Sequence, residues 1–523
     1  MELDPTGRVI SPERPGAVMT VGAFAALFVA LATLAWAKQL NHDEDQYFAA
    51  TVLALHGLPF RDFLYLQTPL QPMVTAPIAA LFPGHVIEAL RLLSAALATL
   101  VGWTVYAGQR RLGVPARVAL LSMLLMASSY IFQFCASVFR NDTLPALFLG
   151  LGLLSALAAL GDSRRRTLSW ALAGLCLAAS ADAKVSFAVP AAAVGGFLIF
   201  EVLRRRSRFS DLLSFGLGAA VGLAPVFLIW TAAPEAFDYG VFGYFAQGPD
   251  DWYRANGMSG TLGPASKLIV TLADLAAGPV LIAIVLVAVA ACRRGNAAPA
   301  LRLLQAASVA GLIAGLLPTP TYRQYFMPLL PPLFMLLGAE LDRLRTAPLR
   351  QRGWAAVLLG LGLAIGAGHY LFVVGGAALS RRWGAPDITR EAHWTGDVLR
   401  AAGARGEIAT LSPHAVLDSG YPLDPRFATG VFVYRSADRL APAMLDRIGA
   451  VSPSTLAMHL DRARPAAILV GHESGKTGSF TVRPDDSLRA YAIAHGYRRF
   501  LSPWRGGELY VRPTAAPQGE VRN

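Results

Sequence analysis

Residues 41–72 read NHDEDQYFAATVLALHGLPFRDFLYLQTPLQP and follow directly after an apolar run, residues 17–37. Three acids, Asp43, Glu44 and Asp45, open this stretch where a membrane-spanning helix would just have ended. An aromatic-rich amphipathic segment follows, and then a turn and a second apolar run. Charged groups at a membrane boundary are costly unless they are solvated or paired, and they often mark a functional site. We therefore interpret this stretch as the first outer loop of a membrane protein.

The composition agrees with a membrane location. Of the 523 residues, 54% are hydrophobic and 15% are charged, whereas a soluble domain carries about 25% charged residues. The net charge of +12 would suit a nucleic-acid partner. However, the basic residues lie in short clusters between apolar runs, where they set topology instead. We expect membrane lipids, and no nucleic acid, as partners.

Apolar runs of spanning length, about 20 residues, recur through two thirds of the chain. We expect about 11 transmembrane helices, at residues 17–37, 86–108, 117–134, 143–160, 167–181, 186–203, 211–232, 267–292, 301–317, 325–341 and 353–376. The run at residues 69–82 is short for a span, so we expect interfacial helices in the first outer loop.

Arginine-rich loops alternate with loops that are poor in cations and hold acids. Under the positive-inside rule, this alternation predicts a cytoplasmic N-terminus, residues 1–16, and acidic loops outside. The membrane domain then covers residues 17–376. An odd number of spans leaves residues 377–523 outside the cytoplasm.

Residues 377–523 have the pattern of a small C-terminal α/β domain. Short apolar runs predict strands at residues 407–412, 466–470 and 508–512. Helical patterns cover residues 387–402 and 487–495. The fold class is thus a polytopic α-helical membrane protein with a periplasmic α/β domain.

The outer loops share one set of polar residues. A carboxylate can take the proton from an attacking hydroxyl, and Arg or Lys can neutralise a departing phosphate. The set comprises Asp43, Glu44, Arg61, Asp62, Arg140, Asp142, Lys184, Tyr322, Arg323 and Tyr325. Spacing alone does not show that these groups meet.

Four motifs resemble the GT-C superfamily of integral-membrane glycosyltransferases, in particular its aminoarabinose transferases and protein mannosyltransferases. They are the acid pair at 43–44 with LPFRDFLYLQTPL, RND at 140–142, AKVSFAVP at 183–190 and YRQYFMPLLPP at 322–332. The resemblance implies transfer of a sugar, with inversion, from a polyprenyl-phosphate carrier to a hydroxyl of a lipid, glycan or protein. It also implies a bacterial inner-membrane location and a role in the cell envelope, such as lipopolysaccharide or glycan modification.

The resemblance also implies roles for individual residues. Asp43 would activate the acceptor, Asp142 would position acceptor or sugar, and Lys184 would contact the carrier phosphate. Relatives often carry Lys-Pro-Pro where this chain has Gln-Thr-Pro at 67–69. The replacement phosphate ligands would be Arg61, Arg140 or Arg323, and the residues lining the site would be Tyr322, Tyr325 and Asp62.

Each residue also has a simpler structural interpretation. Glu44 either shares the catalytic role of Asp43 or orients a helix N-terminus. Asp142 would also cap the following helix, and Lys184 would also anchor at the interface. We expect Asp45 to be solvated. The loop at residues 247–261, rich in glycine and aromatic residues, is a candidate gate.

Two other functions compete with the transferase. One is a transporter or flippase of lipid-linked sugars, which would place its charges near the bilayer midplane. The other is an inactive scaffold that acts through the outer domain. His42, His56 and His85 lack metal-ligand spacing. We therefore expect no cofactor and no metal site, although a divalent metal is left open.

Overall fold

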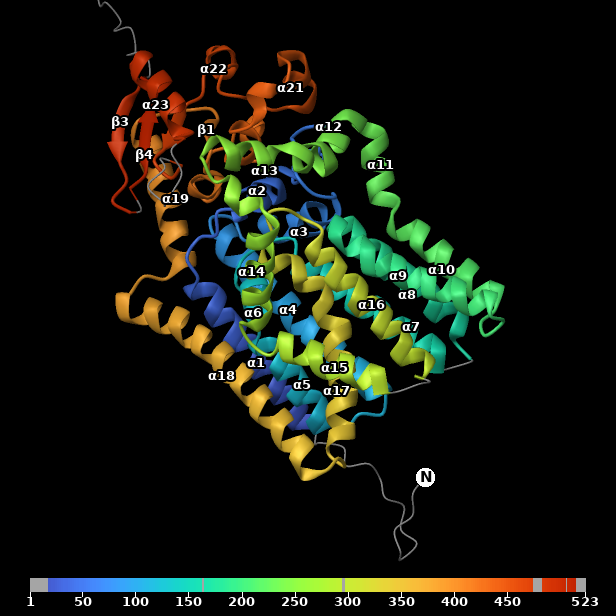
Figure 1. Ribbon diagram of the computed structural model, residues 1–523. Helices are drawn as coiled ribbons and strands as arrows, with labels where there is room; N and C mark the ends of the chain where they lie inside the picture. Colours follow the sequence, from blue (N-terminus) through green and yellow to red (C-terminus); the bar gives the residue numbers. More distant parts are fainter. Residues whose placement is uncertain (1–16, 162–163, 294–296, 474–481, 505, 514–523) are drawn as a thin grey trace, which may run out of the picture.

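The computed structural model describes residues 17–161, 164–293, 297–473, 482–504 and 506–513. Long helices lie side by side in the lower part of Figure 1, and the C-terminal residues cover their upper end. The expected cytoplasmic N-terminus, residues 1–16, lies outside the described residues. The fold class expected from the sequence, a helical membrane body with a small C-terminal sheet, is confirmed.

All of the expected spans are helical. Within the described residues, six helices are long and apolar enough to cross a membrane, and counting each of three bent pairs as one span gives nine. The straight helices are α1 (Ala17–Ala37), α4 (Val86–Arg111), α7 (Thr143–Gly161), α9 (Ala188–Leu203), α16 (Pro299–Leu316) and α18 (Leu349–Ser380). The remaining two expected spans correspond to α8 (Arg166–Ala183) and α17 (Leu330–Leu344). These two helices are shorter or more polar than the six straight ones.

The bent pairs were each expected to be one continuous span. They are α5 (Ala116–Ser128) with α6 (Tyr130–Ser137), bent by 71°; α10 (Phe209–Gly222) with α11 (Ala224–Ala232), bent by 44°; and α14 (Pro264–Ala276) with α15 (Val280–Arg293), bent by 89°.

Two of these breaks pack against each other. Ser129 has an extended backbone and caps the N-terminus of α6, because its hydroxyl accepts a hydrogen bond from the amide of Phe132. Gly278 lies at the α14–α15 break with φ +127°, and a Cβ there would lie 2.9 Å from Cα of Ser129. The amide of Tyr130 donates to the carbonyl of Ala277 at 2.9 Å. This contact fixes the direction of α6, which leads into the loop at residues 138–142.

The loop after α1, predicted to be the first outer loop, folds into two helices, α2 (Glu44–Leu53) and α3 (Leu70–Leu81). α2 is buried on more than one face, because Tyr47 and Phe48 pack with side chains from both the membrane helices and the C-terminal part. α3 leaves Val74 and Leu81 exposed, which suits the expected position at the membrane interface. The first loop therefore lies between the membrane body and the C-terminal part.

A second segment outside the long helices, called the outer segment below, lies over the same end of the body. It comprises α12 (Pro234–Asp238), a π-helical turn (Tyr239–Gly243) and α13 (Tyr244–Ala255). In Figure 1 this segment, drawn in green, runs beneath the red and orange C-terminal helices. Arg439 of the C-terminal part donates to Asp251 at 2.6 Å and to Gln247 at 3.1 Å. The residues expected to form a gate are thus held by the C-terminal part.

The C-terminal part contains a sheet with the order β1-β2-β4-β3 among the described residues. β1 (Ile408–Thr410) is parallel to β2 (Ala467–Val470), and β4 (Glu508–Val511) is antiparallel to both β2 and β3 (Arg498–Leu501). The helices are α19 (Gly384–Ala401), α20 (Val431–Tyr434), α21 (Pro442–Ile448), α22 (Leu456–Ala463) and α23 (Asp485–Ala494). The three expected strands and two expected helices are present. β3 was not predicted, because it is an exposed edge strand that begins with two arginines.

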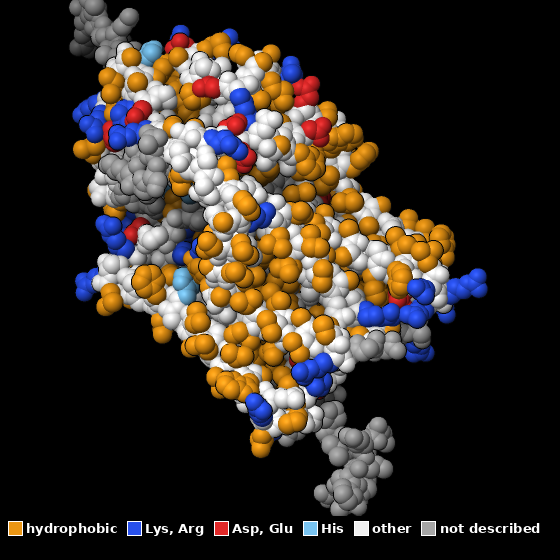
Figure 2. Space-filling model, viewed as in Figure 1, with side chains coloured by type: hydrophobic (Ala, Val, Ile, Leu, Met, Phe, Trp, Pro, Cys, Tyr) orange, Lys and Arg blue, Asp and Glu red, His pale blue; other side chains and the backbone are white. Residues whose placement is uncertain are grey.

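The surface shows the same division between the helical body and the C-terminal part. In Figure 2, hydrophobic side chains cover the helical body, and acidic side chains gather over the C-terminal part. Lys and Arg side chains also mark the opposite ends of the helices. This pattern suits a body embedded in lipid with polar caps at its two ends.

Candidate active site

Four charged side chains from three loops meet at the upper end of the helical body. Asp43 precedes α2, Arg140 and Asp142 lie between α6 and α7, and Lys184 lies between α8 and α9. α8 ends at Ala183 because Lys184 adopts an extended backbone (φ −158°, ψ 124°), and a single 3-10 turn then leads into α9. We call these four residues the charged cluster.

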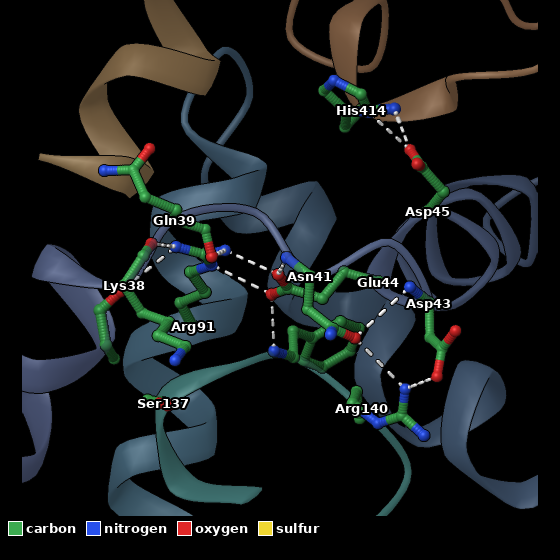
Figure 3. A network of polar contacts seen from close by, with 12 residues as sticks. Lys38, Gln39, Asn41, Asp43, Glu44, Asp45, Arg91, Ser137, Arg140 and His414 are labelled. Carbon is green, nitrogen blue, oxygen red and sulfur yellow. Dashed lines mark hydrogen bonds and ion pairs between the residues drawn. The ribbon is translucent and has the colours of Figure 1, made fainter. Parts of the chain in front are cut away.

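The charged cluster is a continuous chain of ion pairs. Arg140 Nη1 donates to Asp43 Oδ2, as Figure 3 shows, and Arg140 Nε donates to Asp142 Oδ2 at 3.1 Å. Lys184 Nζ donates to Asp142 Oδ1 at 2.5 Å. Asp142 is fully buried, whereas the side chain of Asp43 is 31% exposed. The Asp142 end of the cluster is therefore closed to solvent, and the Asp43 end is open to it.

The electrostatics keep Asp43 ionised. Burial acts to raise the pKa of Asp43, but the facing Arg140 guanidinium and His42 outweigh it and hold that pKa below its ordinary value. Burial likewise acts to lower the pKa of Arg140, and its interactions with Asp43, Asp142 and Tyr47 together outweigh burial and raise that pKa. Two carboxylates thus face two cations, and the cluster has no net charge.

Glu44 lies in a different network from its neighbour. Arg91 of α4 donates to Glu44 through Nε at 2.9 Å and Nη2 at 2.5 Å, and the amides of Phe139 and Asn41 also donate to it, each at 2.8 Å. Both charged side chains are fully buried. Figure 3 shows Glu44 directed to Arg91, while Asp43 points to Arg140. This geometry favours an anchoring role for Glu44 over a catalytic one.

Arg91 was not among the residues predicted for the site. Its Nη1 donates to the carbonyls of Lys38 and Ala35, and its Nη2 to that of Gln39, so it binds the C-terminal end of α1 as well as Glu44. A single arginine inside an apolar span was the available signal, since such a residue needs a partner. Arg91 fixes the loop that carries Asp43.

Asp45 was expected to be solvated, and that expectation is wrong. Its side chain is only 4% exposed, and its Oδ1 accepts from both Nδ1 and the backbone amide of His414, at 2.7 and 2.8 Å. His414 belongs to the C-terminal part, whose position relative to the first loop the sequence did not reveal.

Aromatic residues border the charged cluster. Lys184 Nζ lies 5.6 Å from the ring centre of Tyr325, and the rings of Tyr325 and Tyr322 meet edge to face at 5.9 Å. The hydroxyl of Tyr322 bonds that of Tyr253 in α13. The two tyrosines predicted to line a site thus extend from the cluster to the outer segment. Tyr253 falls in the loop predicted as a gate.

The other predicted residues lie at varying distances from the cluster. Arg323 pairs with Asp274 at 3.4 Å and lies 5.5 Å from the ring centre of Phe134, while Arg140 lies 6.0 Å from that same ring. Arg61 pairs with Asp62 on an exposed turn at 2.7 Å. Arg323 therefore lies beside the cluster, whereas the structure does not bring Arg61 and Asp62 into it.

A group of metal-ligand residues occurs in the described residues, and none of its members belongs to the charged cluster. Glu391, His414 and His472 bring their ligand atoms within 4.8 Å of one another in the C-terminal part. No ligand spacing in the sequence could reveal this group, because its three members lie on three separate elements. In the cluster itself, both carboxylates are already paired with cations.

The fold defines the class of the protein. It matches ArnT from Cupriavidus metallidurans bound to undecaprenyl phosphate with a TM-score of 0.60 and 15% identity, over 96% of this chain and 100% of that chain. The oligosaccharyltransferase AglB from Archaeoglobus fulgidus, in complex with an inhibitory peptide and a dolichol-phosphate, matches with a TM-score of 0.52 and 12% identity. That match covers 96% of this chain and 75% of that chain. The chain has the GT-C membrane fold.

A family-level match is more local. Residues 67–230 match the family described as dolichyl-phosphate-mannose-protein mannosyltransferase. A comparison with curated protein sequences gives no match. The resemblance to GT-C glycosyltransferases is thus confirmed, by the fold over nearly the whole chain and by the family match over residues 67–230.

Proposed function

We propose that the chain is a membrane glycosyltransferase that moves a sugar from a polyprenyl-phosphate carrier to a hydroxyl of a lipid, glycan or protein. The observation that carries this proposal is the charged cluster at one end of a GT-C fold. It offers an ionised carboxylate at the open end and two cations beside it. The proposed location is the outer face of a bacterial inner membrane, with residues 377–523 as a periplasmic domain over the site.

In the proposed reaction, Asp43 takes the proton from the acceptor hydroxyl, whose oxygen attacks the anomeric carbon of the sugar. The bond between that carbon and the carrier phosphate breaks, and inversion follows from a single displacement. The negative charge leaves Asp43 and appears on the phosphate. Arg140 already contacts Asp43, so a short movement of its guanidinium would take it from Asp43 to the phosphate. The net charge of the site would stay constant.

Lys184 and Arg140 are the proposed phosphate ligands, because they are the cations of the cluster. Asp142 pairs with both, so it is proposed to hold them in place rather than to transfer a proton. Arg323 is a third candidate ligand beside Phe134. Arg61 remains a prediction that would require the first loop to move.

A depressed pKa makes Asp43 a weak base in the free protein, since a base works best when its pKa lies near the working pH. Displacement of Arg140 onto the carrier phosphate would remove the largest of the interactions that lower this pKa and leave only that of His42. Burial would then raise the basicity of Asp43 only when the donor is bound. The arrangement thus supports a base that is activated by its own substrate.

The test is glycosyl transfer by purified protein with a panel of polyprenyl-phosphate sugars. Replacement of Asp43 by Asn should lower transfer by about 100- to 10,000-fold, the usual contribution of a general base, and should leave carrier binding intact. The matched control is Asp446→Asn, an outer aspartate paired with Arg426 at 2.9 Å, which should retain full activity. Full activity in a folded Asp43→Asn protein would refute the role of Asp43.

The same preparations distinguish a glycosyltransferase from a flippase. Wild-type protein that neither transfers nor hydrolyses any donor, but carries lipid-linked sugar across a liposome bilayer, would favour transport. The position of the charged cluster in outer loops, at one end of the helices, supports the enzyme instead.

A further inference from the structure

Three potential metal ligands meet where the C-terminal part touches α2. Glu391 belongs to α19, His414 lies in the short 3-10 turn Pro413–Ala415 that follows β1, and His472 follows β2. Glu391 is fully buried and His414 is 1% exposed, while the side chain of His472 is 9% exposed. Two imidazoles and a carboxylate away from the charged cluster form a set that the proposed transfer does not use.

The arrangement of the three ligand atoms is close to the arrangement around a bound metal ion. His472 Nε2 lies 3.3 Å from Glu391 Oε1, and the two imidazole rings lie edge to face with centres 5.0 Å apart. All three ligand atoms fall within 4.8 Å of one another. Tetrahedral zinc with bonds of about 2.0–2.1 Å places its ligand atoms roughly 3.4 Å apart. Small side-chain rotations would therefore close the set around one ion.

The surroundings orient the ligands as in known zinc sites. The Asp45 carboxylate holds Nδ1 of His414 at 2.7 Å, so Nε2 is the nitrogen that would face the ion. A metal-bound histidine commonly gives its second nitrogen to a carboxylate in this way. Ser502 Oγ donates to Glu391 Oε1 at 3.1 Å.

Gly507 keeps the space around these ligands small. A Cβ at this position would lie 2.8 Å from Glu391 Oε1 and 3.0 Å from His472 Nε2. Any side chain here would displace both groups.

We propose that Glu391, His414 and His472 bind one divalent transition-metal ion, with zinc as the expected metal and water as the fourth ligand. The simpler interpretation is a buried His–Glu ion pair. That interpretation does not require the second histidine, its orientation by Asp45, or the glycine beside both ligand atoms. Imidazole with carboxylate suits zinc and also ferrous iron, so the metal analysis must identify the ion.

The ion would act as a structural clamp. His414 reaches α2 through Asp45, two residues after Asp43 in the chain, and Glu391 and His472 belong to other elements of the C-terminal part. A bound metal would therefore join three C-terminal elements to the loop that carries the proposed base. It would contact no residue of the charged cluster.

The test is metal content of the full chain, purified in detergent through a tag without histidines and incubated with zinc before desalting. Elemental analysis should find about one zinc per wild-type chain, the stoichiometry of one site, and strongly reduced zinc in His472→Gln and Glu391→Gln. The matched control is His459→Gln, because His459 pairs with Asp424 at 2.6 Å in the same part of the chain. That variant should keep its metal.

Two further measurements separate metal loss from misfolding. Cobalt-loaded wild type should show the visible absorption of a tetrahedral site, and His472→Gln should lose it while keeping the elution volume of wild type. Asp45→Asn should retain the ligands but bind zinc about 10- to 100-fold more weakly. Wild type without zinc or another transition metal after loading, or equal zinc in the two ligand variants, would overturn the proposal. Metal content does not depend on sugar transfer, so either proposal can fail alone.

Discussion

At the residue scale, Arg140 has the strongest lowering effect on the pKa of Asp43. The guanidinium contacts both carboxylates of the cluster, and together with His42 it outweighs the burial that would otherwise raise the pKa of Asp43. The folded protein therefore binds fewer protons at this carboxyl than the unfolded chain does. The contribution of this pair to stability is present above the unfolded pKa of about 3.9, and it is lost as pH falls toward the folded pKa.

Arg140→Gln should change the pH dependence of transfer. In wild type, protonation of Asp43 should not limit kcat/KM above pH of about 4, its ordinary pKa. Without the guanidinium, His42 alone opposes the effect of burial on the pKa of Asp43, so the acid limb of kcat/KM should move to higher pH and the rate should fall. The measurement is kcat/KM across the pH range in which circular dichroism shows folded protein. Arg140→Lys, which keeps the charge, should hold the limb near its wild-type position.

An acid limb that is the same in wild type and Arg140→Gln would mean that Arg140 does not control Asp43. An acid limb in wild type that Asp43→Asn retains would assign that limb to another group.

At the element scale, α2 is held in place by a buried ion pair. Glu44, its first residue, accepts from Arg91 and from two backbone amides. A buried charge left without its partner costs about 3–5 kcal/mol. The position of Asp43 at the start of this helix thus depends on an interaction inside the membrane body.

Glu44→Gln should therefore lower the thermal unfolding midpoint by several degrees, since it leaves the Arg91 charge uncompensated. Glu235→Gln is the control, because Glu235 and its partner Arg447 are each 57% exposed and exposed pairs contribute about 0–1 kcal/mol. Thermal unfolding in detergent measures both. A Glu44→Gln protein with an unchanged midpoint and no transfer would instead support the catalytic role predicted from the sequence.

The elements themselves were predictable where local sequence decides them. The length of the apolar runs predicted the membrane helices, and short apolar runs, which are buried in the structure, predicted β1, β2 and β4. The break at Ser129 was not predictable, because it depends on the contact with Gly278, some 150 residues later, and on Gln133 bonding the carbonyls of Ser128 and Gly366. β3 presents exposed arginines in place of an apolar run.

The candidate site was predictable in part. The acids and cations of outer loops could be named from sequence, and the structure brings Asp43, Arg140, Asp142 and Lys184 together. Their pairing was not predictable, since it depends on how three loops pack. The burial of Asp45 also required the position of the C-terminal part. The catalytic and binding roles remain predictions.

At the scale of the whole molecule, the charged cluster and the C-terminal part lie at the same end of the helices (Figure 1). Loops with several arginines lie at the other end, including the turn at Arg205 with φ +59°. Transfer from a carrier outside the cytoplasm requires that the first end faces the periplasm.

This orientation can be measured with cysteine labelling. Cys135, Cys176 and Cys292 are first replaced by Ala, and a single cysteine is then introduced by Asp397→Cys, where the side chain is 72% exposed, or by Arg205→Cys. A membrane-impermeant maleimide added to spheroplasts should label the first protein. It should label the second only after the membrane is permeabilised. The opposite pattern would invert the topology and place the cluster in the cytoplasm.

The neutrality of the charged cluster has a consequence for product release. After transfer, the carrier phosphate would hold Arg140 and Lys184 while Asp43 keeps the proton, so product affinity and proton binding are thermodynamically linked. Polyprenyl phosphate should therefore bind more tightly as pH falls, and its binding at neutral pH should take up protons. Calorimetric titrations in two buffers with different heats of ionisation should then give different apparent enthalpies. Equal enthalpies would show that the phosphate leaves the Asp43–Arg140 pair intact, and release of the spent carrier would then be independent of periplasmic acidity.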